Sequence, residues 1–169
     1  MKRKYLLIGA LLLAVCISIS AVSADESWSW SFGSSSSSES NSNGGDVSID
    51  NNKVKIQGFE FTIPDGYKEN ESARLVGNDT DQNAFPGFKI SQVRFDKGDD
   101  SVIVKVVYGD KEMNADSYTP QNGSASEKIN DVDGFFAQYN DGVTFDYIKD
   151  GKLVELFAPN KEILVSLVK

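Results

Sequence analysis

The chain has 169 residues and a formal net charge of −8 at neutral pH. It contains no histidine, and its single cysteine is Cys16. These absences exclude intramolecular disulfides, zinc sites built from histidine or cysteine clusters, and Ser-His-Asp or Cys-His catalysis. Because an acidic surface repels phosphate groups, we also expect no nucleic-acid partner.

The first 24 residues have the pattern of a secretory signal. Three cations at positions 2–4 precede an uncharged, mainly apolar run over residues 5–22, and Val22 and Ala24 supply the small residues of a cleavage site. We therefore expect cleavage after Ala24 and an extracellular or cell-surface location. Two alternatives remain open: the run is long enough to stay as an N-terminal membrane anchor, or Cys16 carries a lipid. Membrane contact is expected only through an N-terminal segment that is not cleaved.

Residues 25–45 form a serine-rich segment. Between Ser27 and Gly45, ten of the 19 residues are serine and none is lysine or arginine. Such a composition buries too little apolar surface to offset the entropy lost on ordering. We predict a flexible linker over residues 25–45, followed by a single domain over residues 46–169.

From Asp46 onward, apolar and polar residues alternate between turn residues, a pattern typical of antiparallel strands. The predicted strands are Val47–Ile49, Val54–Ile56, Phe59–Ile63, Phe88–Phe95, Ser101–Tyr108, Phe135–Tyr139, Val143–Lys149 and Leu153–Phe157. Helices are predicted over Tyr67–Leu75 and Asn160–Val168, the second with Asn160 as its N-cap. The expected fold class is α+β: one mainly antiparallel sheet with the C-terminal helix packed on one face.

The dipeptide Asp150-Gly151 indicates a two-residue hairpin turn. Pairing across this turn places Asp146 directly opposite Glu155. Carboxylates that face each other repel, so we expect the pKa of one of them to rise and Glu155→Gln to stabilise the fold. Either the pair is exposed, where water and nearby lysines screen it, or it forms a small cation or substrate site flanked by apolar residues.

Two acidic loops carry incomplete patterns for a cation site. The first has the spacing that opens an EF-hand loop, at Asp79, Asp81 and Asn83. Its sixth and twelfth positions are Ala84 and Ile90, where calcium loops have glycine and glutamate. The second is an acidic turn between two predicted strands, with carboxylates at Asp96, Asp99 and Asp100. A solvated loop explains both patterns more simply, so we expect no metal and no other cofactor.

Three asparagines, Asn70, Asn78 and Asn122, fit the N-glycosylation acceptor pattern. All three lie in predicted loops or polar segments of a chain expected to be exported. Modification at one or more of them is therefore a hypothesis that depends on the host.

Residues 54–67, VKIQGFEFTIPDGY, resemble the opening of uncharacterised small exported proteins of methanogenic archaea. The likeness continues at residues 127–134 (EKINDVDG) and 145–154 (FDYIKDGKLV). A strand that ends in Ile-Pro-Asp-Gly-Tyr, followed by a late sheet and a terminal helix, is also similar to the PsbP-like α/β sandwich. This second resemblance implies a non-enzymatic accessory module. Neither resemblance assigns a functional residue.

These observations favour a non-enzymatic, secreted or cell-surface binding or accessory module with an unknown protein or cell-wall partner. One alternative is an extracellular hydrolase that uses carboxylates alone, since glycosidases need only two of them. The other alternative is a carrier that holds an apolar ligand between sheet and helix. A cleft with facing carboxylates would favour the hydrolase, a large apolar cavity the carrier, and a filled core the binding module.

Overall fold

The computed structural model describes residues 47–80 and 85–169. The predicted signal peptide, the predicted linker, Asp81 and Asn83 lie outside the described residues. The strands in chain order are β1 (Val47–Asp50), β2 (Lys53–Ile56), β3 (Phe59–Thr62), β4 (Lys68–Glu69), β5 (Leu75–Asp79), β6 (Phe88–Lys97), β7 (Asp100–Gly109), β8 (Ala125–Ile129), β9 (Val132–Gln138), β10 (Val143–Lys149) and β11 (Lys152–Ala158). The helical segments are the 3-10 turns η1 (Glu71–Ala73) and η2 (Ala115–Ser117) and the α-helix α1 (Lys161–Leu167).

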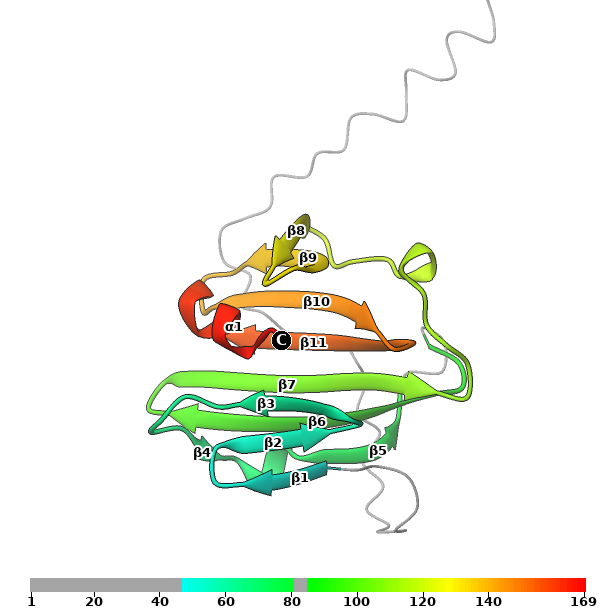
Figure 1. Cartoon of the computed structure of the whole chain (residues 1–169). Coiled ribbons are helices and arrows are strands. Elements are labelled where there is room, and N and C mark those ends of the chain that lie inside the picture. The colour runs from blue at the N-terminus through cyan, green and yellow to red at the C-terminus, as the bar shows by residue number, and fades with distance from the viewer. Residues whose placement is uncertain (1–46, 81–84) are drawn as a thin grey trace, which may run out of the picture.

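Most of the strands belong to one large antiparallel sheet. Its strand order is β4-β6-β7-β11-β10-β9-β8, and β5 lies beside β4 along the outer edge of β6. Figure 1 shows this sheet from β4 and β5 at the bottom to β8 at the top. In this sheet β7 lies next to β11. In the sequence the two strands are separated by the connection from β7 to β8 and by the strands β8, β9 and β10.

A second, smaller antiparallel sheet consists of β1, β2 and β3. It lies in front of the large sheet in Figure 1, on the same side as α1. Buried side chains of both sheets and of α1 share one hydrophobic core, which fills the space between these layers. Burial of such apolar surface is the main stabilising contribution to a fold of this size. The prediction of an α+β fold with a C-terminal helix is correct, but the strands divide into two sheets instead of one.

The end of the chain folds as its sequence predicts. Asn160 is the N-cap of α1, and its side-chain oxygen accepts a hydrogen bond from the backbone N–H of Ile163 at 3.0 Å. Leu164 and Leu167 point into the core, and Val168 is buried beside them. The amphipathic pattern of this segment therefore positions α1 over β10 and β11.

The β10–β11 hairpin has the predicted register. Its two-residue turn places Asp150 and Gly151 at φ values of +51° and +69°. These left-handed conformations are those of a turn whose twist matches that of the strands. Lys149 then pairs with Lys152, and Asp146 pairs with Glu155.

The helix predicted over Tyr67–Leu75 is wrong. This segment contains β4 and η1, and β5 begins at its last residue. Both strands pair with the outer edge of β6, so the ladder of an existing sheet outweighs the weak helical preference of a short polar segment. A strand that was not predicted, β8, forms the opposite edge of the sheet and pairs with β9.

Candidate functional site

The face of the large sheet that points away from α1 carries a row of polar residues near its centre. Cross-strand partners share a face of a sheet. The register places Lys105 of β7 beside Glu155 of β11, and Glu155 beside Asp146 of β10. The row continues to Gln92 on β6 and to Phe135 on β9. Residues two positions away on the three central strands are mostly apolar, namely Ile103, Val107, Leu153, Phe157 and Ile148.

Lys105 and Glu155 form a buried ion pair. Their side chains are each 1% exposed, and Lys105 Nζ lies 2.5 Å from Glu155 Oε2. Removing two charges from water is unfavourable, and only close contact between them compensates for the loss of hydration. The interpretation of Glu155 as an exposed carboxylate, screened by water, is therefore wrong.

Asp146 is the third charged residue of the row and is 2% exposed. Its Oδ2 accepts a hydrogen bond from the hydroxyl of Tyr118 at 2.8 Å. Within the described residues, its Oδ1 is buried and has no hydrogen-bond partner. The Tyr118 ring also packs on Phe135, with 5.8 Å between the ring centroids. One oxygen of Asp146 is thus fixed, and the other remains available inside the fold.

Burial shifts the pKa values of all three groups toward their neutral forms. It lowers the pKa of Lys105, although the charge of Glu155 acts in the opposite direction. Burial raises the pKa of Glu155, which Lys105 opposes. Burial and then the charge of Glu155 raise the pKa of Asp146 to about 7. The expected rise in a carboxyl pKa is therefore present, with burial as its main cause.

The connection between β7 and β8 covers this row. The backbone N–H of Met113 donates a hydrogen bond to the carbonyl of Gly151 at 2.8 Å, which attaches the connection to the β10–β11 turn. Met113 is buried against Val107 and Leu153. Tyr118 extends the same cover to Asp146. The cover keeps water from the three charged side chains, and their desolvation follows from it.

A cleft of about 430 Å³ lies beside this covered row. Its volume is within the range of small-molecule sites in proteins. Its apolar lining includes Ala115, Tyr118, Phe135 and Ile148. Its polar lining comes from the β8–β9 hairpin, namely Ser126, Glu127, Lys128 and Asp133. Aromatic surface and groups that both donate and accept hydrogen bonds therefore occur together in this cleft.

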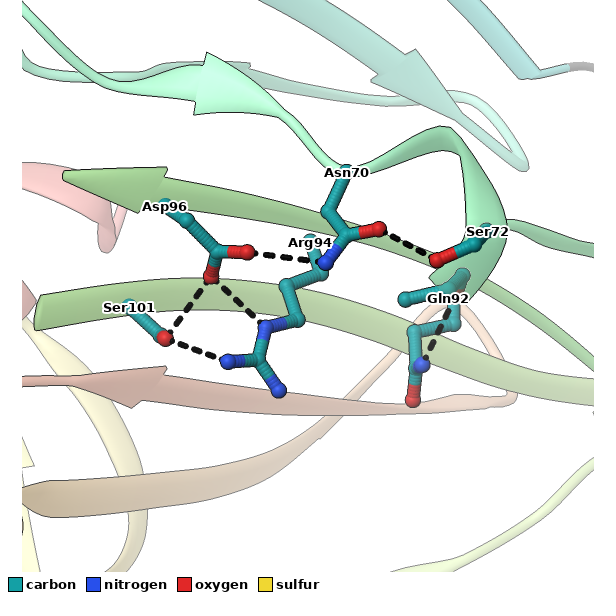
Figure 2. Close-up of polar contacts among 7 residues, drawn as sticks. Asn70, Ser72, Gln92, Arg94, Asp96 and Ser101 are labelled. Atoms are coloured by element: carbon teal, nitrogen blue, oxygen red, sulfur yellow. Dashed lines mark hydrogen bonds and ion pairs between the residues drawn. The ribbon is translucent and has the colours of Figure 1, made fainter. Parts of the chain in front are cut away.

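The acidic turn between β6 and β7 is not arranged as a cation site. The two strands extend further than predicted, so that Lys97 pairs with Asp100 across a two-residue turn. Figure 2 shows that Asp96 instead accepts hydrogen bonds from Arg94, Ser101 and Asn70. Partial burial alone would raise its pKa, but these hydrogen bonds bring the pKa of Asp96 below the ordinary value.

The other acidic candidate, Asp79, is the last residue of β5 and pairs with Lys89. Within residues 47–80 and 85–169, no group of three or more acidic residues is placed to hold a metal ion. Asp96, Asp99 and Asp100 therefore do not converge on a common point in this part of the chain.

The three glycosylation candidates lie in different environments. The Asn70 amide donates to Asp96 at 2.8 Å and accepts from Ser72 at 2.6 Å (Figure 2), so its side chain is fixed within the fold. Asn78 lies in β5 and accepts a hydrogen bond from the backbone N–H of Val76. Asn122 is exposed in the turn before β8. A glycan is sterically easiest to accommodate at Asn122.

Sequence reasoning identified the two facing carboxylates but missed Lys105 and Tyr118. A signal for Lys105 is present, because a single lysine interrupts the apolar run of residues 102–107. A charge inside such a strand indicates a buried partner on a neighbouring strand. No comparable signal marks Tyr118, which lies in a long polar connection.

Compared with known proteins, the chain matches no protein-family model, no curated protein and no solved structure. Among the residues that the structure describes, no helix is long and apolar enough to cross a membrane.

Proposed function

We propose that this protein is a non-enzymatic binding module of the cell surface or the extracellular space, and that it binds a saccharide in the cleft beside Tyr118. The N-terminal signal, cleaved after Ala24 or kept as an anchor, exports the chain. The serine-rich segment over residues 25–45 then connects the folded domain to its point of attachment. A non-enzymatic role is also what the PsbP-like resemblance implies.

The composition of the cleft is the observation that carries the proposal. A sugar ring has an apolar face and a rim of hydroxyl groups that both donate and accept hydrogen bonds. Tyr118 and Phe135 offer aromatic surface for the apolar face. Asp133 offers an acceptor, Lys128 offers a donor, and Ser126 offers both. Lys128 and Asp133 contact each other at 3.2 Å while largely exposed, so a ligand can replace this weak contact without leaving a charge buried.

Two features argue against the alternative functions. The facing carboxylates Asp146 and Glu155 are covered by the β7–β8 connection and contact Tyr118 and Lys105, so a polysaccharide cannot reach them without rearrangement. A carrier would need free volume between sheet and helix. That space contains packed side chains, including Phe145, Leu164 and Leu167.

Titration of the ¹⁵N-labelled protein with cellobiose and chitobiose, followed by NMR, tests the proposal. We expect shift changes confined to Tyr118 and the β8–β9 hairpin. Ala115→Trp fills the cleft and should abolish them, whereas Val76→Trp, at a position 47% exposed on β5, should preserve them. Shift changes that survive Ala115→Trp would overturn the assignment of the cleft. Cleavage of either disaccharide in the sample would favour the hydrolase instead.

A further inference from the structure

The contact between Lys105 and Glu155 has the geometry of a condensation reaction. The two residues face each other on adjacent strands, and the Lys105 amine and the Glu155 carboxyl group are both buried. Since Nζ lies 2.5 Å from Oε2, it lies at most about 3.7 Å from the carboxyl carbon, because a carbon–oxygen bond is about 1.2 Å long. This separation is close to that of reacting atoms held for attack. We propose that Lys105 and Glu155 are joined in the mature fold by an intramolecular isopeptide bond.

The reaction is balanced without any co-reactant. The lone pair of Nζ forms a bond to Cδ of Glu155, and one Cδ–O bond breaks. The departing oxygen leaves as water with one proton from the amine and one from the carboxylic acid. The product is a neutral amide, and nothing is oxidised or reduced.

Burial provides the reactive protonation states. An amine attacks only when it is not protonated, and a carboxylic acid loses its oxygen more readily than a carboxylate does. Burial shifts the pKa of Lys105 downward and that of Glu155 upward, so both shifts favour the reactive pair over the ion pair. The amide carries no charge, so condensation also removes two charges from an environment that solvates them poorly.

Asp146 is placed to carry the proton. It lies opposite Glu155 in the register, on the side away from Lys105. Tyr118 holds its Oδ2, while its Oδ1 is buried without a hydrogen-bond partner among the described residues. A carboxyl group with a pKa of about 7 accepts and returns a proton at neutral pH with little free-energy difference. Asp146 interacts electrostatically with both Lys105 and Glu155, so in the proposed reaction it carries the proton from the attacking nitrogen to the departing oxygen and is unchanged at the end.

The bond would connect distant parts of a chain that cannot form an intramolecular disulfide, since Cys16 is its single cysteine. It would join β7 to β11 and close the loop over residues 105–155. Such a closure restricts the unfolded chain and so favours the folded state. Formation of this bond requires no ligand in the cleft.

Peptide mapping of the purified full-length protein by mass spectrometry tests the proposal. After denaturation and trypsin digestion, we expect residues 98–111 to be joined to residues 153–161, with a mass lower by one water than the sum of the two peptides. Lys161 and Glu127 provide an internal control, because their contact is also 2.5 Å long but exposed. We expect no bond there.

Two variants complete the experiment. Asp146→Asn keeps a side chain of the same shape but removes the proton carrier, so the bond should form much more slowly or not at all. Glu155→Ala removes the electrophile and should give only unlinked peptides. Complete recovery of unlinked peptides from the folded wild-type protein would overturn the proposal. A bond from Lys105 to Asp146 would overturn the assignment of Glu155 as the partner.

Discussion

The hydrogen bond between Tyr118 and Asp146 offers the sharpest test of how the polar row is held. Tyr118→Phe removes the hydroxyl and keeps the ring that packs on Phe135. The change leaves Oδ2 of Asp146 without its donor in a site that is 2% exposed. We therefore expect Tyr118→Phe to destabilise the domain.

The size of the effect depends on the charge of Asp146. Its pKa of about 7 makes it mainly ionised at about pH 8 and mainly protonated at about pH 5. A hydrogen bond to a charged group contributes about 1.5–3 kcal/mol, and one between neutral groups contributes about 0.5–1.5 kcal/mol. The loss in Tyr118→Phe should therefore be larger at the higher pH. The sign agrees with the pKa, since this hydrogen bond lowers the pKa of Asp146 and so favours its ionised form.

Urea denaturation of both proteins at the two pH values measures this difference. Tyr67→Phe is the matched control, because it removes a hydroxyl from a half-buried tyrosine outside the polar row. We expect it to change the free energy of unfolding little at either pH. A loss in Tyr118→Phe that is equal at both pH values would refute the role of Asp146 ionisation. An unchanged free energy of unfolding at both pH values would show that the Tyr118 hydroxyl does not stabilise the fold through its hydrogen bond to Asp146.

Two further predictions concern the same region. Because burial above all raises the pKa of Asp146 from 3.8 to about 7, its contribution to stability is fully present below about pH 4 and is lost as the pH rises through about 7. Relative to the wild type, Asp146→Asn should therefore gain about 3 kcal/mol between about pH 5 and pH 8 in urea denaturation, and a constant difference would contradict this pKa. Gly134→Ala would place a Cβ 2.5 Å from Phe145 Cζ and 2.6 Å from the carbonyl oxygen of Asp146. It should lower the free energy of unfolding by about 1–3 kcal/mol, and an unchanged denaturation midpoint would mean that β9 and β10 are not so closely packed.

The parts of the fold that could be predicted from the sequence are those specified by local patterns. The β10–β11 register follows from one dipeptide and from apolar alternation, and the α1 cap follows from one asparagine before an amphipathic run. The edge strands β4, β5 and β8 could not be found in this way. Their sequences are polar and short, and their partners on β6 and β9 decide their conformation.

The candidate site shows the same division. Asp146 and Glu155 share a hairpin, so their pairing could be predicted, whereas Lys105 reaches Glu155 through a contact between β7 and β11 that no local pattern specifies. This missing partner reverses the expected effect of Glu155→Gln. The substitution removes the carboxyl group that Lys105 contacts, as an ion pair or as the acid of the proposed amide. Loss of one member of a buried pair destabilises a fold by about 3–5 kcal/mol. Relief of repulsion from Asp146 is smaller, because Asp146 is partly protonated at neutral pH.

A buried lysine between apolar neighbours is not what stability alone requires. Replacing buried ion pairs by packed apolar side chains is often neutral or stabilising, so an ion pair at the centre of a sheet is weak evidence for a structural role. Here the pair comes with a third carboxyl group, a hydroxyl that fixes one of its oxygens, and a covering segment that excludes water. Burial beneath this cover favours the neutral, reactive forms of Lys105 and Glu155, although the charge of Asp146 acts in the opposite direction on the pKa of Lys105. An arrangement that is unfavourable as a set of separate charges becomes favourable once the amine and the acid have condensed, because the amide leaves only Asp146 to be accommodated.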